Sequence, residues 1–269
     1  MIKVCVNGAD GNMGGLVTKK VIDDPDLELV AAVSMPNSPN LGKDIGTFLG
    51  LDSVNVKIRS SEELDDILST PIDFFIDFTV AKAAESNILR VLDKKINCIV
   101  GTTGMKPEFY TNFEKKVIED KISGMISPNM SIGVNIFFQT VRNLTKILKE
   151  YDIEIIEKHH HRKRDSPSGT AQKTAKIIAE VLEKDLAKIE KFGRQGESKR
   201  KIGAEELGMH CVRAGDIVGD HTVLYAGPGE RIEITHMAHS RDCFANGTIQ
   251  AIKFMNEKGP GYWNMEDLI

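Results

Sequence analysis

The fold of this chain is decided by residues 2–14, which read IKVCVNGADGNMG. The apolar run Ile2–Asn7 predicts a buried strand, and the glycines that follow permit a tight turn into a helix over Asn12–Asp23. The N-terminus of such a helix presents N–H groups that suit a pyrophosphate. The spacing is Gly-x-x-Gly-x-Met-Gly rather than Gly-x-Gly-x-x-Gly, so an ordinary strand-to-helix turn is the alternative interpretation.

The rest of the first hundred residues alternates short apolar runs with helical patterns. Strands are expected at Leu27–Val33, Phe74–Phe78 and Ile96–Val100, and helices at Ser60–Leu68 and Ala81–Asp93. Ser60 and Glu63 have the spacing of a capping box at the start of the first of these helices. Continuous apolar strands that alternate with helices are typical of α/β proteins, so we expect a Rossmann-like, doubly wound parallel sheet.

The pattern changes after Pro128 and predicts a second domain of α+β type. Helices are expected at Ile132–Lys149 and Thr170–Lys184, and strands at Ile153–His160, His210–Arg213, Thr222–Ala226 and Glu230–Ala238. The last three strands alternate apolar and polar residues between glycine-rich turns, which favours a mixed or antiparallel open sheet. The helical pattern of Asp242–Lys258 could return to the first domain. We therefore expect a dinucleotide-binding domain of residues 1–127 with 240–269, and a substrate-binding and oligomerisation domain of residues 128–239.

Composition excludes several classes of protein. The 269 residues carry 35 lysines and arginines against 39 acids, a net charge of −4, which argues against a nucleic-acid partner. The four cysteines form no Cys-x-x-Cys pair, so neither a zinc site nor a redox dithiol is indicated, and a reducing cytoplasm fits best. The N-terminal apolar run is too short for a signal peptide, and residues 122–141 contain too many polar residues, glycines and a proline for a membrane span.

Three positions beyond the glycine loop concern the cofactor. In dinucleotide-binding folds, the end of the second strand carries an acid for a ribose 2′-hydroxyl or an arginine for a 2′-phosphate. Here that position reads Ser34-Met35, which favours neither, so we expect NADH and NADPH to be used with weak discrimination. Asp77-Phe78-Thr79 and Gly101–Gly104 follow later strands, and Phe78, Thr79 and the second loop could line the nicotinamide half of the site. Ordinary turns are the alternative for both loops.

The most specific stretch is residues 157–171, which read EKHHHRKRDSPSGTA. Histidine exchanges a proton near neutral pH, Lys163 can hold an anion or donate a proton, and Ser168-Gly169-Thr170 opens a helix whose N–H groups suit a carboxylate. Together they predict a site for a small anionic substrate that must be protonated. Consecutive histidines on a strand point to opposite faces, which disfavours a metal site. A solvated basic loop, followed by a helix that Ser168 merely caps, is the alternative interpretation.

These motifs, in this order, resemble the dihydrodipicolinate reductases, which are 4-hydroxy-tetrahydrodipicolinate reductases of lysine and diaminopimelate biosynthesis. The resemblance rests on Gly8–Gly14, Phe75–Thr79, Gly101–Gly104, Asn129–Asn135 and the stretch from His159 to Ala171, and it continues through Arg213–Thr222, Gly229–His236 and Ser240–Gly247. It spans nearly the whole chain.

The resemblance implies a role for each matching residue. His159 would match the catalytic acid/base of the family, Lys163 its proton donor, and His160, Gly169 and Thr170 the positions that hold the substrate carboxylates, beside Ser168. The implied cofactor contacts are Gly8, Ala9, Asp10, Gly11, Asn12, Met13, Ser34, Gly101, Thr102, Thr103, Ser127, Pro128, Asn129 and Met130. It also implies NADH or NADPH as cofactor, a small dicarboxylate as substrate, hydride transfer to C4 with protonation of the adjacent carbon, and a homotetramer built through the sheet of the second domain.

The chain departs from the family pattern in three places. The family commonly has an acid, often followed by a basic residue, where this chain has Ser34-Met35, and this puts the choice of cofactor in doubt. Arg then His is frequent where this chain has His161-Arg162, and Ser127-Pro128 replaces small residues.

The rival functions are another imine or amino-acid dehydrogenase, which should lack Lys163 and the carboxylate clamp, and a non-enzymatic NAD(P)H sensor, which has no need of His159.

Overall fold

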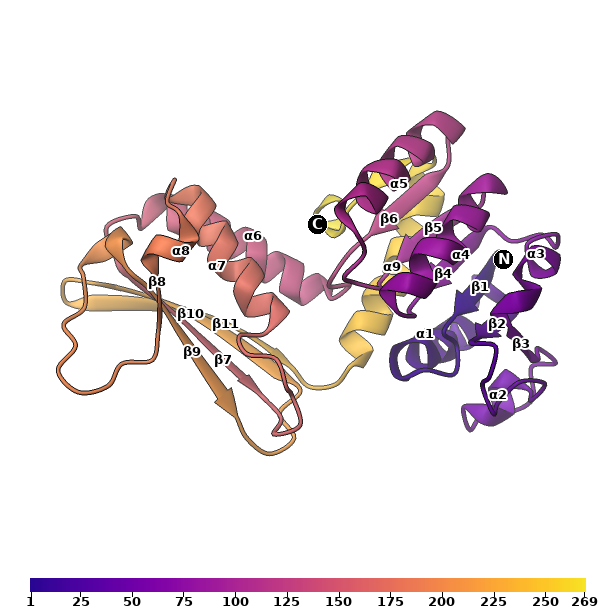
Figure 1. The fold of residues 1–269 in the computed structure, drawn as a ribbon, viewed down its shortest axis with the longest axis horizontal. Helices are drawn as coiled ribbons and strands as arrows, with labels where there is room; N and C mark the ends of the chain where they lie inside the picture. The colour runs from indigo at the N-terminus through magenta and orange to yellow at the C-terminus, as the bar shows by residue number, and fades with distance from the viewer. The chain divides into compact units, whose positions relative to one another are not determined.

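The computed structural model describes residues 1–269, and the chain divides into two compact units. The first unit comprises Met1–Ile132 and Arg241–Ile269, and the second comprises Gly133–Ser240 (Figure 1). The chain thus leaves the first unit once and returns to it for its last 29 residues. No helix is both long and apolar enough to cross a lipid bilayer.

The first unit is built on a seven-stranded sheet in which all neighbouring strands are parallel, in the order β12-β6-β5-β4-β1-β2-β3. Its strands are β1 (Ile2–Asn7), β2 (Leu27–Ser34), β3 (Ile58–Ser60), β4 (Phe74–Asp77), β5 (Asn97–Val100), β6 (Ser123–Ile126) and β12 (Gly261–Trp263). The chain moves outward from β1 to β3, then restarts at β4 on the other side of β1. This reversal creates a crevice at the carboxyl ends of β1 and β4, where doubly wound sheets bind ligands.

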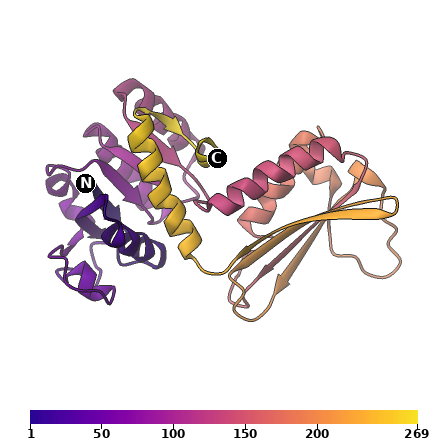
Figure 2. The ribbon, with the colours of Figure 1, turned by 180° about the vertical axis from the view of Figure 1, so that it is seen from behind.

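Helices cover both faces of this sheet, which is why its strands are apolar throughout. They are α1 (Asn12–Asp23), α2 (Ile45–Phe48), α3 (Leu64–Ile67), α4 (Ala81–Asp93), α5 (Pro107–Asp120) and α9 (Asp242–Lys258), with short 3₁₀ turns η1 (Ser61–Glu63) and η3 (Met265–Leu268). Helix α9 lies beside α1 and packs Ile249, Ile252 and Met255 into one core, whereas α4 and α5 belong to the core of the other face (Figure 2).

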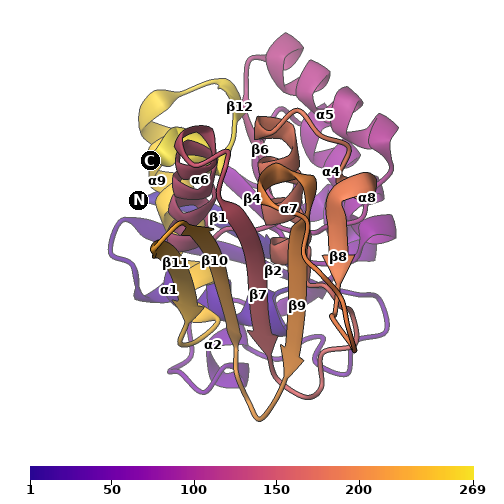
Figure 3. The same ribbon diagram turned by 90° about the vertical axis from the view of Figure 1, so that its left-hand side faces the viewer.

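The second unit is a five-stranded mixed sheet with helices on one face. Figure 3 shows its strands side by side in the order β11-β10-β7-β9-β8. They are β7 (Asp152–His159), β8 (Glu190–Phe192), β9 (Leu207–Arg213), β10 (Gly219–Gly227) and β11 (Glu230–Ala238), with helices α6 (Ile132–Ile147), α7 (Gly169–Val181) and α8 (Leu186–Ile189) and the turn η2 (Gly203–Glu205). Alternate residues of β7 are buried, because one face of the sheet packs on α6 and α7.

The expected fold class is confirmed, with a parallel Rossmann-like sheet and a second sheet of mixed strands. Most long elements lie within a few residues of their predicted bounds, and the capping box of Ser60 and Glu63 is present. The helix expected over Ser60–Leu68 is instead a 3₁₀ turn followed by one turn of α-helix. Strands of three residues, such as β3 and β12, were not predicted, because so few residues carry no periodic signal.

Candidate functional site

The glycine loop between β1 and α1 has the backbone that close approach to a ligand requires. Gly8 has φ +81°, and a Cβ atom there would lie 2.4 Å from the carbonyl oxygen of Phe78. A Cβ atom at Gly14 would lie 2.0 Å from the carbonyl oxygen of Gly8, so no larger residue fits either position without moving backbone. Glycine here holds the turn tightly against the end of β4, and a dinucleotide phosphate fits such a cradle at a helix N-terminus.

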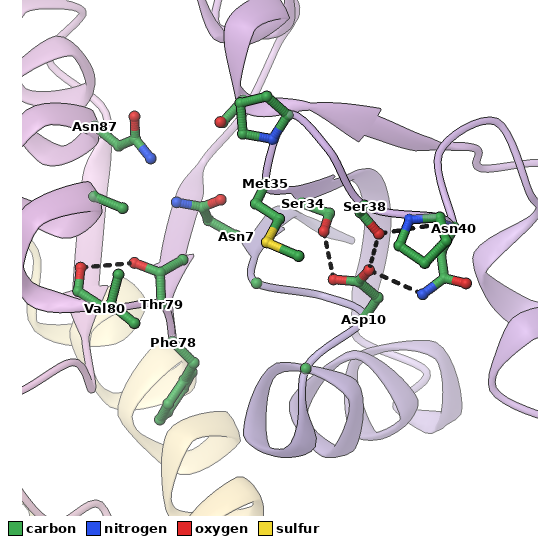
Figure 4. A pocket seen from close by; sticks show the side chains of 16 residues that line it. Asn7, Asp10, Ser34, Met35, Ser38, Asn40, Phe78, Thr79, Val80 and Asn87 are labelled. Atoms are coloured by element: carbon green, nitrogen blue, oxygen red, sulfur yellow. Dashed lines mark hydrogen bonds between the residues drawn. The ribbon is translucent and has the colours of Figure 1, made fainter.

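A pocket of about 450 Å³ opens at the carboxyl ends of these strands. Six residues predicted for the cofactor site line it, namely Gly8, Asp10, Gly11, Ser34, Phe78 and Thr79. Asp10 and Thr79 lie on opposite sides of the pocket (Figure 4). The pocket therefore lies where the strand order of the sheet changes direction, with the end of β2 on one side and the end of β4 on the other.

A buried carboxylate ties the ends of three strands together beneath this pocket. Asp77 at the end of β4 accepts hydrogen bonds from Asn7 Nδ2 at 2.7 Å, Thr102 Oγ1 at 2.6 Å and Thr79 Oγ1 at 2.9 Å. Burial raises the pKa of Asp77 in spite of these donors. Because Thr102 also accepts from the backbone N–H of Thr79 at 2.8 Å, the loops after β4 and β5 are fixed to each other.

The other predicted cofactor residues lie around the pocket without lining it. A Cβ atom on Gly101 would lie 2.1 Å from the Phe78 ring, so this glycine gives the ring its room. Ser127 Oγ donates to the carbonyl oxygen of Asn129, which shapes the loop after β6. Ala9 and Met130 are buried and belong to the core. The remaining predicted contacts, Asn12, Met13, Thr103 and Pro128, are also absent from the pocket lining.

In the second unit, His159 is oriented by a buried glutamate. Both residues lie on β7, and because side chains alternate along a strand, Glu157 and His159 share the face that packs on the helices. His159 Nδ1 is hydrogen-bonded to Glu157 Oε2. At Gly219, on neighbouring β10, an added Cβ would lie 3.0 Å from His159 Nε2, so the absence of a side chain leaves room at the second ring nitrogen. This pairing fixes the imidazole and leaves Nε2 as the nitrogen that could exchange a proton.

Glu157 is also held by two other elements. Arg213, at the end of β9, donates to its two carboxylate oxygens at 2.9 and 2.7 Å, and the backbone N–H of Ser168 donates at 3.1 Å. Burial alone would raise the pKa of Glu157, but the hydrogen bonds from His159 and Arg213 hold it well below its ordinary value. Glu157 is therefore a carboxylate at neutral pH.

The anion-binding groups expected after His159 lie in the loop that leads into α7. Lys163 Nζ forms an ion pair with Asp165 at 2.9 Å. Ser168 is the N-cap of α7 and accepts from the backbone N–H of Ala171 at 3.2 Å, as its sequence position predicted. Gly169 begins the helix, with nothing within 4 Å of the position of its Cβ. The helix thus presents its first N–H groups beside an open position.

The sequence has two basic stretches, residues 158–165 and 191–201, and their arginines differ in the structure. Arg162 and Arg164 are exposed, in agreement with the solvated-loop interpretation of these two side chains. Arg194 and Arg200 instead bind Glu154, on the face of β7 opposite Glu157. Burial would raise the pKa of Glu154, but the hydrogen bonds that it accepts from these arginines and from His210 lower it to about 2. The two arginines of the second stretch are therefore neutralised by acids of their own unit.

His221 packs against His159 and is kept uncharged. The two rings lie 5.1 Å apart at an interplanar angle of 72°, and His221 Nε2 is 3.0 Å from Ser168 Oγ. Burial, reinforced by the charge of His159, lowers the pKa of His221 from 6.5 to about 3. The unfolded chain therefore binds a proton at a pH where the folded chain does not, and stability is lost as pH falls from 6.5 towards about 3.

Acidification should consequently destabilise the protein through His221. When the pH is lowered from about 7 to about 5, proton binding by His221 in the unfolded chain is expected to lower the free energy of unfolding by about 2 kcal/mol. The variant His221→Gln should not show this part of the loss. Urea unfolding of both proteins at the two pH values measures the difference. The contribution of His236, whose pKa burial also lowers, is common to both proteins and cancels. An equal loss in both proteins would contradict the assignment of a neutral His221.

Several residues of these clusters were not among the predicted site residues. Glu157 could have been found, because its spacing of two from His159 on a strand puts both side chains on one face. Arg213 and His221 could not, since strand pairing alone brings β9 and β10 beside β7. Ser38 and Asn40, which line the pocket of the first unit, follow β2 in a loop without any recognisable motif.

The parallel sheet with its change of strand order at β1, the glycine cradle and the pocket at the strand ends define the first unit as a dinucleotide-binding fold. This is the class of fold found in nicotinamide-dependent oxidoreductases. Two family models match nearly the whole chain. The model described as dihydrodipicolinate reductase, N-terminus, matches residues 2–130, and the model described as dihydrodipicolinate reductase, C-terminus, matches residues 133–269. The chain belongs to the dihydrodipicolinate reductase family.

Curated relatives agree with this family over their full length. The chain is 44% identical over 262 residues to the 4-hydroxy-tetrahydrodipicolinate reductase of Methanothermobacter thermautotrophicus, covering 97% of this chain and 96% of the relative. It is 43% identical over 271 residues to that of Methanocaldococcus jannaschii, covering 100% of this chain and 97% of the relative.

Solved structures share the fold at lower identity. Dipicolinate-bound dihydrodipicolinate reductase from Paenisporosarcina sp. TG-14 matches with a TM-score of 0.79 and 24% identity over 100% of both chains. An amine dehydrogenase from Mycobacterium smegmatis matches with a TM-score of 0.61 and 12% identity, covering 98% of this chain and 95% of the neighbour. The fold is therefore common to oxidoreductases that act on different substrates.

Proposed function

We propose that the chain catalyses the NAD(P)H-dependent reduction of 4-hydroxy-tetrahydrodipicolinate to tetrahydrodipicolinate, a step of lysine and diaminopimelate biosynthesis. The observation that carries this proposal is the identity of 44% to a reductase of this name over 97% of the chain. Membership of the family makes the chain an oxidoreductase with a nicotinamide cofactor. When bound, the cofactor supplies the hydride.

The residues of the second unit would supply the proton and hold the substrate. His159 would act as acid/base through Nε2, since Glu157 engages its Nδ1. Lys163 would donate the proton, with Asp165 as its partner before substrate binds. A dicarboxylate needs at least two cationic or N–H-rich contacts, and His160 with the helix start at Gly169 and Thr170 is proposed to provide them.

In the first unit, the pocket would hold the dinucleotide. The cradle of Gly8 and Gly14 is proposed to take the pyrophosphate at the start of α1. Ser34 would face the adenosine ribose, while Phe78 and Thr79 would lie nearer the nicotinamide. The four cysteines are free, which accords with residence in a reducing cytoplasm.

An assay of NAD(P)H oxidation tests the activity directly. The substrate should be the freshly made product of dihydrodipicolinate synthase. Other oxidoreductases share this fold, so only activity on this particular substrate distinguishes the proposed reaction from theirs. Oxidation that depends on this product is expected. Oxidation with simple imines of amino acids, and none with the synthase product, would overturn the proposal in favour of another dehydrogenase.

We also propose a homotetramer that forms through the sheet of the second unit. One face of this sheet packs on helices, while apolar side chains such as Val212 and Met237 are 41% and 58% exposed. Exposed apolar residues on an open sheet favour association with another copy. Sedimentation equilibrium should give four chains, and a monomer at micromolar concentration would contradict the proposal.

A further inference from the structure

The pocket of the first unit contains an acid in an unexpected place. Asp10 belongs to the glycine loop, whereas Ser34 is the last residue of β2. Asp10 Oδ1 nevertheless accepts a hydrogen bond from Ser34 Oγ at 2.6 Å. Its Oδ2 accepts from Ser38 Oγ at 2.5 Å and from Asn40 Nδ2 at 3.1 Å (Figure 4). The strand end itself has no acid, but the loop brings one to the same point.

This carboxylate is charged at neutral pH. Burial alone would raise the pKa of Asp10, but the hydrogen bonds from Ser34, Ser38 and Asn40 lower it below its ordinary value. A fixed negative charge therefore lines the pocket at the position where dinucleotide-binding folds meet the adenosine ribose. It would attract the proton of a 2′-hydroxyl and repel a 2′-phosphate.

The two serines reinforce this selection through the direction of their hydrogen bonds. A serine hydroxyl has one proton and two acceptor lone pairs, and Ser34 and Ser38 both give their proton to Asp10. What remains for a ligand is the capacity to accept. A ribose hydroxyl can donate to such an oxygen, whereas an ionised phosphate is an acceptor and finds no donor in either serine.

No lysine or arginine forms an ion pair with Asp10. Met35, which follows Ser34, is uncharged. Lys43 is exposed, and its Nζ donates to Asn40 Oδ1 at 2.9 Å. Arg59 is bound by Glu63 and Asp66.

We propose that Asp10 is a specificity-determining residue that excludes a 2′-phosphate, so that the chain binds NADH in preference to NADPH. The inference rests on the proposed cofactor role of this pocket. It replaces the weak discrimination between NADH and NADPH that Ser34-Met35 alone indicated by a preference for NADH. Position 10 supplies the acid that dinucleotide-binding folds often carry at the end of the second strand. The arrangement requires the glycine loop, Ser34 and Ser38 together.

The unmodified protein provides the first test. Binding of NADH and NADPH, followed by nicotinamide fluorescence, should show a dissociation constant at least tenfold lower for NADH. In competition with NADH, 5′-ADP should displace better than 2′,5′-ADP, because the discrimination lies at the ribose. Equal or tighter binding of NADPH, preference for 2′,5′-ADP, or no binding of NADH would overturn the inference.

Asp10→Asn tests the residue itself. Loss of the charge should reduce the NADPH-to-NADH ratio of dissociation constants about tenfold, mainly through tighter NADPH binding. Asp52→Asn removes one exposed acid of the same unit and should leave the ratio unchanged, as should Lys43→Gln. An unchanged ratio in Asp10→Asn, or a larger effect of Lys43→Gln, would overturn the inference. Because binding needs no turnover, a protein that binds with this ratio but does not reduce the synthase product would refute the proposed reaction alone.

Discussion

Replacing His159 by glutamine, or Lys163 by alanine, is expected to lower kcat by about a hundredfold or more, the usual contribution of a general acid or base. Glutamine retains the size of histidine but cannot exchange a proton near neutral pH. Lys163 lies in a loop and pairs with Asp165, so its loss should remove a cation without disturbing the sheet. Steady-state kcat with the synthase product measures both effects.

A control from the same loop separates chemistry from general charge. Arg164 is exposed and one residue from Lys163, and Arg164→Ala removes one positive charge with little expected change in kcat. Circular dichroism should show native structure in all three variants. Near-full kcat in both site variants would refute the assignment of the proton-transfer roles.

Glu157→Gln is expected to produce the second large effect, through the orientation of His159. A carboxylate that holds a catalytic imidazole contributes up to ~10⁴-fold to kcat in other enzymes. We expect a loss of at least tenfold in kcat here, with a smaller change in KM, because the imidazole would no longer be held in one orientation. The variant should also lose roughly 3 kcal/mol of stability, since Arg213 keeps a poorly matched partner.

The same strand offers a matched control for Glu157. Glu154 is also held by arginines, but on the opposite face of β7. Glu154→Gln should therefore reduce stability and leave kcat unchanged. Partial recovery of kcat in Glu157→Asp would support an orienting carboxylate. If Glu157→Gln reduced stability but retained kcat, Glu157 would be structural alone.

The histidine stretch illustrates how much of the candidate site could be predicted. His159, Lys163 and Ser168 lie within ten residues of one another, so their spacing alone indicates an anionic substrate. Their contacts depend on distant residues. Arg213 is 56 residues from Glu157 and reaches it because β9 pairs with β7 with His159 opposite Arg213. Strand register is a property of the whole sheet, and single-strand periodicity does not reveal it.

The sequence by itself determined the fold class, because the apolar runs, the glycine turn and the helical periods are local patterns that backbone sterics and burial convert directly into strands and helices. It also predicted that the glycine loop and the start of α7 bind anions. The tertiary structure decided which charges meet. Asp10 reaches Ser34 across 24 residues and Glu157 reaches Arg213 across 56, and these pairings set the charge and the hydrogen-bond direction of each site. Hydrogen bonds depend on distance and angle in space, which spacing along the chain does not specify.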